Sequence, residues 1–298
     1  MSTAEFESLT EVAAELGLPP TAIPPAERRE VHLGDGQALS LIQWGESEPE
    51  IVFLHGGAQN ARTWDLVVLG LGRPALAIDL PGHGHSSWRE DKDYGPFRNA
   101  EAVAAAVEKH APKARGVAGM SLGGLTAIRL AATRPDLARR VLLVDVTPGS
   151  ADAVAAMSAV QRGAVALASG PRTFDSLDDM VNAAVTASPR RPASAVRRGV
   201  IHNSRELPGG TRAWRYDLPA RRSVEEMGGL WSDVDRLTMP VMLVRGGDSG
   251  FVTDEDLAEA RRRLPGLRVE TVPDAGHAVQ SDQPAALTRL VREFLIDG

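Results

Sequence analysis

The chain has 298 residues, of which 43% are hydrophobic and 24% are charged. These ordinary values exclude a disordered chain, which would need fewer apolar residues and a larger net charge. The formal net charge of −6 argues against nucleic-acid binding as the main activity, because phosphate contacts require a basic surface. Cysteine is absent, which excludes disulfide bonds, a thiolate nucleophile and cysteine-based metal sites.

No segment has the length of a membrane span. The longest apolar stretches, such as Ile51–Leu54 and Val141–Val144, are far shorter than the roughly 20 residues that a membrane helix needs. The first 17 residues contain four glutamates and neither Lys nor Arg, whereas a signal peptide has a basic start and an apolar core. We therefore expect a cytoplasmic protein with no membrane partner.

The N-terminal segment carries apolar residues at helical spacing between Ala4 and Leu16. This spacing predicts a short amphipathic helix, and a frayed tail is the alternative. Gly17 and the prolines after it end the pattern and indicate a stiff linker. We assign residues 1–28 to this helix and linker.

Short apolar runs then alternate with helical patterns. The expected strands are Glu30–Leu33, Ala38–Trp44, Ile51–Leu54, Ala75–Leu80, Arg115–Met120, Arg140–Val146, Pro240–Arg245 and Leu267–Val272. The expected helices are Trp64–Leu71, Arg98–His110, Leu122–Thr133, Thr253–Leu264 and Gln283–Leu295. Wholly apolar strands that alternate with helices indicate a parallel sheet covered on both faces.

One segment interrupts this alternation. Between Thr147 and Asp235 there is no strong strand pattern, and helical patches are separated by loops rich in Pro, Arg and Gly. We expect an inserted, mostly helical cap over residues 147–235. The core would then consist of residues 29–146 and 236–298.

A G-x-S-x-G motif at residues 119–123 carries the chemistry. An expected strand precedes Ser121 and an expected helix follows it, which is the context that a nucleophile elbow requires. Glycines on both sides allow the close backbone approach of a sharp turn. The helix N-terminus directs free N–H groups and the positive end of its dipole at the reacting centre. The sequence therefore predicts Ser121 as a nucleophile.

A serine nucleophile needs a base, and the base needs an orienting carboxylate. His277 lies just after the last expected strand, at the edge of the sheet where Ser121 also lies. Asp248 follows the preceding strand and is the favoured acid, which gives the order Ser, Asp, His. Asp145, at the end of the strand 140–146, is the rival acid.

The oxyanion of an acyl-transfer reaction must be stabilised by backbone donors. The N–H of Leu122, directly after the nucleophile, is one expected donor. The N–H of Gly57, in the glycine-rich turn after the strand 51–54, is the other. We expect His55, in the same turn, to serve packing and hydrogen bonding.

These motifs together resemble the α/β-hydrolase superfamily, in its branch with a helical cap. The resemblance is carried by HGG at 55–57, Trp64, DLPGHGHS at 79–86, GMSLGG at 119–124, GGD at 246–248 and GH at 276–277. It implies a mostly parallel, doubly wound, eight-stranded sheet with an inserted helical cap. It also implies the roles given above to Ser121, His277, Asp248, Gly57 and Leu122.

The resemblance implies a serine hydrolase that cleaves a carboxylic ester, thioester or lactone of a small, apolar molecule through an acyl-enzyme. Relatives with an aspartate nucleophile, the haloalkane dehalogenases and epoxide hydrolases, are disfavoured by Ser121. A C–C bond hydrolase of a vinylogous diketone is an alternative, although Ala278 stands where such enzymes usually carry Trp. A small-molecule receptor with little turnover is a third possibility.

Aromatic residues are scarce, at 4% of the chain, and three notable ones lie in the expected cap. Trp214, Tyr216 and Trp231 would line a substrate pocket or anchor the cap to the core. Four cap arginines, at positions 190, 191, 197 and 198, would form a solvated face or hold an acidic substrate group.

No cofactor or metal is expected, because neither metal-ligand spacing nor a nucleotide-binding loop is present. The expected partner is a small-molecule substrate, with no nucleic acid. The sequence gives no indication of the oligomeric state.

Overall fold

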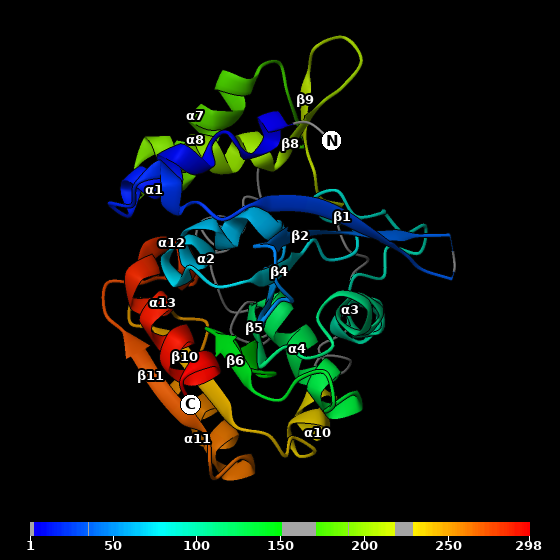
Figure 1. The fold of residues 1–298 in the computed structure, drawn as a ribbon, viewed down its shortest axis with the longest axis vertical. Coiled ribbons are helices and arrows are strands. Elements are labelled where there is room, and N and C mark those ends of the chain that lie inside the picture. Colours follow the sequence, from blue (N-terminus) through cyan, green and yellow to red (C-terminus); the bar gives the residue numbers. More distant parts are fainter. Residues whose placement is uncertain (1–2, 35, 151–170, 190, 218–228) are drawn as a thin grey trace.

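The structure is a computed structural model, and it describes residues 3–34, 36–150, 171–189, 191–217 and 229–298. Eight strands form one sheet in the order β1-β2-β4-β3-β5-β6-β10-β11 (Figure 1). They are β1 (Ala26–His32), β2 (Ala38–Trp44), β3 (Ile51–Leu54), β4 (Ala75–Ile78), β5 (Gly116–Met120), β6 (Val141–Val144), β10 (Val241–Gly246) and β11 (Arg268–Val272). Only β2 runs antiparallel to its neighbours in this sheet, which confirms the predicted mostly parallel architecture.

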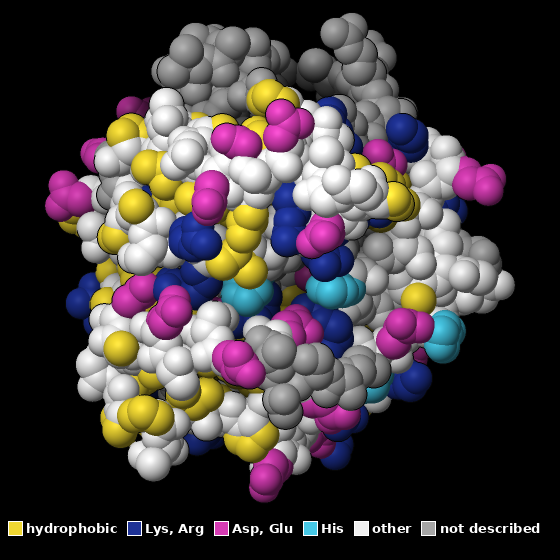
Figure 2. Space-filling view, turned by 90° about the horizontal axis from the view of Figure 1, so that it is seen from above, with side chains coloured by type: hydrophobic (Ala, Val, Ile, Leu, Met, Phe, Trp, Pro, Cys, Tyr) yellow, Lys and Arg dark blue, Asp and Glu magenta, His cyan; other side chains and the backbone are white. Residues whose placement is uncertain are grey.

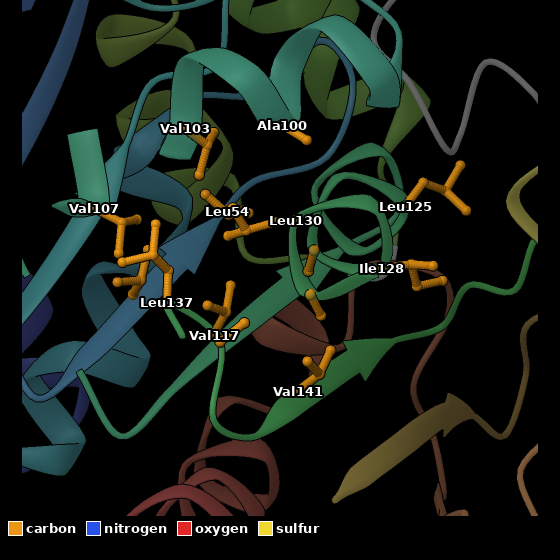
Figure 3. Close-up of a cluster of buried hydrophobic side chains, with 14 of the residues drawn as sticks. Leu54, Ala100, Val103, Val107, Val117, Leu125, Ile128, Leu130, Leu137 and Val141 are labelled. Atoms are coloured by element: carbon orange, nitrogen blue, oxygen red, sulfur yellow. The ribbon is translucent and has the colours of Figure 1, made fainter. Parts of the chain in front are cut away.

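Helices cover both faces of the sheet, because the central strands are apolar on both sides. Their side chains alternate between two buried clusters: Val52 and Leu54 face one, Ile51 and Phe53 the other. Figure 3 shows part of the first cluster, where α3 and α4 pack on the strands. The helices are α1 (Leu9–Glu15), α2 (Asp65–Leu71), α3 (Pro96–His110), α4 (Leu122–Thr133), α7 (Leu177–Ala187), α8 (Ala193–His202), α10 (Leu230–Val234), α11 (Asp254–Arg263), α12 (Val279–Asp282) and α13 (Pro284–Val291). Shorter turns are η1 (Thr3–Phe6), η2 (Pro20–Ala22), η3 (Ala61–Trp64) and the π-helical η5 (Arg292–Ile296).

The N-terminal segment forms the predicted amphipathic helix. Its apolar face is buried in the second cluster, through Leu9, Val12 and Ala13. The polar face contacts α8: the Ser8 hydroxyl lies 2.9 Å from Nε2 of His202, and Glu15 pairs with Arg198 at 2.6 Å. Helices α1, α7 and α8 therefore lie together at one end of the molecule (Figure 1).

The described part of the expected cap contains more than helices. It includes α7, α8 and a small antiparallel sheet of β7 (Thr173–Phe174), β9 (Arg212–Trp214) and β8 (Ser204–Glu206). We did not predict these strands, because two or three residues are too few to show an alternating pattern. Helix α10 packs on the core through Leu230 and Val234. The division into core and cap stays a prediction.

The end of the molecule that carries α1 and α8 has a mixed surface. In Figure 2, acidic and basic side chains are interspersed there with hydrophobic ones. Within the described ranges, no helix has the length and apolar character needed to cross a bilayer.

Candidate active site

The turn between β5 and α4 is a sharp nucleophile elbow. Ser121 has φ 50° and ψ −119°, a backbone conformation that side-chain-bearing residues rarely adopt. A Cβ atom on Gly119 would lie 2.4 Å from the carbonyl oxygen of Gly123. One on Gly123 would lie 2.3 Å from the carbonyl oxygen of Leu54. The two glycines therefore permit the close packing that holds Ser121 at the N-terminus of α4.

The glycine-rich turn after β3 packs against this elbow. A Cβ atom on Gly56 would lie 2.4 Å from Sδ of Met120 and 3.3 Å from Cβ of Ser121. A Cβ atom on Gly57 would have no neighbour within 4 Å, so this residue faces open space. Ala58 follows with φ 59°. The turn thus brings the backbone of residues 56–58 to the predicted nucleophile.

His55 holds this turn in place, in agreement with its predicted role. Its Nε2 accepts a hydrogen bond from the N–H of Leu80 at 2.9 Å. Its Nδ1 therefore carries the proton and donates to the carbonyl oxygen of Gly56 at 2.7 Å. Burial lowers the pKa of His55 to about 3, so the ring stays neutral.

The predicted base, His277, is hydrogen-bonded to a buried carboxylate. Its Nδ1 lies 2.8 Å from Oδ2 of Asp145, and the two side chains are 4% and 0% exposed. A carboxylate accepts, so the proton resides on Nδ1 and the lone pair on Nε2. Nε2 is buried and has no hydrogen-bond partner. This tautomer leaves the Nε2 lone pair available, as the predicted role of a general base requires.

The carboxylate that binds His277 in the structure is that of Asp145, the rival acid of the sequence analysis, where the sequence favoured Asp248. The reason is a crossing of two chain segments. A Cβ atom on Gly246 would lie 2.3 Å from the carbonyl oxygen of Gly276, so the loop after β11 passes directly over the end of β10. This crossing carries His277 to the end of β6, where Asp145 stands. The side chain of Asp248 is exposed.

The loop after β10 surrounds the Asp145–His277 pair. The N–H of Gly246 donates to Oδ1 of Asp145 at 3.0 Å, and the hydroxyl of Ser249 donates to Oδ2. The ring of Phe251 stacks on the imidazole, with centroids 3.4 Å apart and planes 12° apart. Sequence reasoning missed Ser249 and Phe251, because a serine and a phenylalanine in a loop give no recognisable pattern.

Of the three aromatic residues predicted for a substrate pocket, Trp214 and Tyr216 come together and Trp231 lies apart. Trp214 and Tyr216 are buried and stack with centroids 5.9 Å apart, and Tyr216 also stacks on His83 at 6.4 Å. Trp231 lies on α10, where it packs on the core and under Arg263. These positions favour the anchoring interpretation for all three.

A cavity of about 170 Å³ lies beside Gly57, between the segment 57–66 and α8. Its walls carry apolar residues such as Leu66 and Val196 beside the polar side chains of Asn60, Arg62, Asp65 and His202. Arg62 pairs with Asp65 at 2.6 Å inside this wall. Among the described residues, no group of three or more His, Asp or Glu side chains is arranged to hold a metal ion.

The cap arginines are paired with acidic side chains. Arg197 binds Asp178 at 2.9 Å and Arg191 binds Asp282 at 3.0 Å, while Arg198 binds Glu15 as described above. Arg190 lies outside the described residues. These ion pairs favour a structural role for Arg191, Arg197 and Arg198 over a site for an acidic substrate group, although Arg191 and Arg198 also line the cavity beside Gly57.

Comparisons with known proteins place this geometry among enzymes. A family model described as "Alpha/beta hydrolase family" matches residues 51–290. The chain is 52% identical to Esterase Rv0045c of Mycobacterium tuberculosis, over 98% of this chain and 95% of that protein. A crystal structure of that esterase matches with a TM-score of 0.87 at 47% identity, over 100% and 99% of the two chains. The sn-1-specific diacylglycerol lipase ABHD11 of Mus musculus is 29% identical, over 87% of this chain and 84% of its own.

Proposed function

Since the chain belongs to the alpha/beta hydrolase family, and is thus a hydrolase, we propose that it cleaves a carboxylic ester of a small molecule through a catalytic triad of Ser121, His277 and Asp145. The hydrogen bond from Nδ1 of His277 to Asp145, which leaves Nε2 free, is the observation that carries this proposal. The names of the esterase and the diacylglycerol lipase support an ester as the substrate.

The sheet register supports the participation of Ser121 in this triad. Met120 and Val144 are paired residues of β5 and β6, so Ser121 and Asp145 follow neighbouring strands at the same level. The N–H of Ser121 donates to the carbonyl oxygen of Val144 at 3.2 Å. His277, bound to Asp145, is therefore on the same edge of the sheet as the nucleophile.

The reaction then takes two acyl-transfer steps. Oγ of Ser121 attacks the ester carbonyl carbon, and Nε2 of His277 takes the hydroxyl proton. The same nitrogen returns that proton to the departing alkoxide, which leaves as the alcohol and gives an acyl-enzyme. His277 then takes a proton from water, whose oxygen attacks the acyl carbon. Ser121 leaves with that proton, and the carboxylic acid is released.

Asp145 and two backbone donors stabilise the charges that develop. The buried carboxylate of Asp145 faces the imidazolium that forms on His277. The N–H groups of Gly57 and Leu122 are the proposed donors to the oxyanion. Gly57 supports this role because it faces open space in a turn packed against Ser121. Removing one such donor in other enzymes costs about 10²–10³ in rate.

Residues 147–235 are proposed to be a cap that selects the substrate. The described part of this segment has its own buried cluster, which includes Met180 and Trp214. It packs against the turn after β3, where Nδ2 of Asn203 donates to the carbonyl oxygen of Ala58 at 2.8 Å. The cavity beside Gly57 is therefore a candidate for part of the substrate site.

Hydrolysis of nitrophenyl esters by the wild type and by Ser121→Ala tests the proposal. The wild type is expected to turn over at least one ester of a chain-length series, and Ser121→Ala is expected to lose this activity. A coloured dienoate assayed in parallel tests C–C bond hydrolysis, and cleavage of the dienoate with no ester turnover contradicts the proposal. Unchanged ester turnover in Ser121→Ala would remove Ser121 from the mechanism.

A further inference from the structure

The carboxylate of Asp145 is fully buried, so each of its two oxygen atoms needs at least one hydrogen-bond donor. Oδ1 accepts from the backbone N–H of Gly246 at 3.0 Å. Oδ2 accepts twice, from Nδ1 of His277 at 2.8 Å and from the hydroxyl of Ser249. Ser249 therefore contacts the same oxygen atom that binds the proposed catalytic base.

The direction of the Ser249 hydroxyl is set by its second contact. The N–H of Phe251 donates to Oγ of Ser249 at 3.2 Å, so this oxygen acts there as an acceptor. Its own proton is then available to Asp145, which can only accept while it is ionised. The N–H of Ser249 donates to the carbonyl oxygen of Gly246 at 3.1 Å, which closes the loop into a tight turn.

The same loop also fixes the imidazole. Phe251 is 5% exposed, and its ring lies flat against that of His277. The segment from Gly246 to Phe251 thus contacts both oxygens of the carboxylate and one face of the ring. In this arrangement neither Asp145 nor His277 can rotate without breaking a contact to the loop.

We propose that Ser249 is a positioning residue of the hydrolase: its hydroxyl orients the Asp145 carboxylate, and through it the His277 imidazole. This inference rests on the proposed function. Hydrogen bonds to charged groups contribute about 1.5–3 kcal/mol, which corresponds to a factor of roughly ten to a hundred in rate. The loss is expected in kcat, because Ser249 acts on the base and not on bound substrate.

The test is a double-mutant cycle on ester hydrolysis, with the variants Ser249→Ala, Asp145→Asn and the pair combined. Ser249→Ala is expected to lower kcat roughly ten- to a hundredfold, with KM within about twofold of the wild type. In the Asp145→Asn background the same change should lower kcat less than about threefold, because the carboxylate through which Ser249 acts is gone. Equal losses in the two backgrounds, or no loss in the wild-type background, would overturn the proposal.

Two further variants separate positioning from folding. Ser249→Thr keeps the hydroxyl and should recover most of the kcat lost in Ser249→Ala, whereas a loss as large as that of the alanine variant contradicts the proposal. Asp248→Asn, at the neighbouring exposed position of the same loop, is expected to keep wild-type kcat. Ser121→Ala reports on the proposed function separately: ester turnover that survives this change refutes the triad whatever the Ser249 variants show.

Discussion

Replacing Asp145 by Asn distinguishes the proposed acid, which binds His277 in the structure, from Asp248, the acid expected from the sequence. The carboxylate accepts from three donors, on Gly246, Ser249 and His277. An amide offers one accepting oxygen and one NH₂ group. If the NH₂ group takes the place of Oδ1, it faces the N–H donor of Gly246. If it takes the place of Oδ2, it faces the donors of Ser249 and His277. Either orientation places two donors against each other in a buried site.

The catalytic loss follows from the second orientation and from the missing charge. His277 is driven to the tautomer with its proton on Nε2, and the imidazolium loses its counter-charge. The comparable change in a serine protease lowers kcat about 10⁴-fold, or about 5.5 kcal/mol of barrier. Asp145→Asn should therefore lose about 10³–10⁴ in kcat on a nitrophenyl ester. The unmatched donor should cost about 1–3 kcal/mol of unfolding free energy, measured by urea denaturation.

Asp248→Asn is the matched control, because that side chain is exposed on the loop that crosses beneath His277. Its kcat should stay within about twofold of the wild type, as for surface substitutions in general. A large loss in Asp248→Asn combined with a small loss in Asp145→Asn would refute the assignment of Asp145.

Three other predictions concern stability. Gly123→Ala should lower the free energy of unfolding, measured by urea denaturation, by about 1–3 kcal/mol or more. The reason is that the added Cβ would lie 2.3 Å from the carbonyl oxygen of Leu54 in β3. A variant as stable as the wild type would contradict this packing. Burial lowers the pKa of His202 to about 3 from 6.5, so between these values the unfolded chain binds more protons and stability falls as the pH falls. His202→Gln should reduce the slope of unfolding free energy against pH in this range by up to about 1.4 kcal/mol per pH unit. Urea titrations at several pH values measure this slope, and an unchanged slope would contradict the neutral, buried state of His202. Arg28 pairs with buried Asp79 at 2.8 Å and helps to hold the pKa of Asp79 below its usual value, so Asp79→Asn should lower the free energy of unfolding by about 3–5 kcal/mol. Asp91 is exposed, so Asp91→Asn should leave the stability almost unchanged. Equal melting temperatures for these two variants would refute the difference.

The sheet and its helices could be predicted because their signals are local. Runs such as Ile51–Leu54 are apolar on both faces, and the structure buries all four residues between helices. Ser121 was identifiable for a similar reason, since the glycines that permit the elbow lie within two residues of it. His277 was located by its place after the last strand.

The choice between Asp145 and Asp248 depends on tertiary structure. Both residues follow apolar strands, and the sequence does not say which of the two carboxylates the loop of His277 reaches. The close passage of the loop after β11 over Gly246 decides which carboxylate His277 reaches. This passage is possible because Gly246 has no side chain, and a single glycine gives no distinct sequence pattern. The contacts of Ser249 and Phe251 arise from the same crossing and were missed for the same reason.

Labelling of the wild-type protein with a fluorophosphonate probe, followed by peptide mass analysis, tests the central claim most directly. The probe reacts with a serine only when a base activates it, so the account predicts a single adduct on Ser121. Asp145→Asn should label much more slowly and Asp248→Asn at the wild-type rate. No adduct, or an adduct on another residue, would contradict the triad of Ser121, His277 and Asp145.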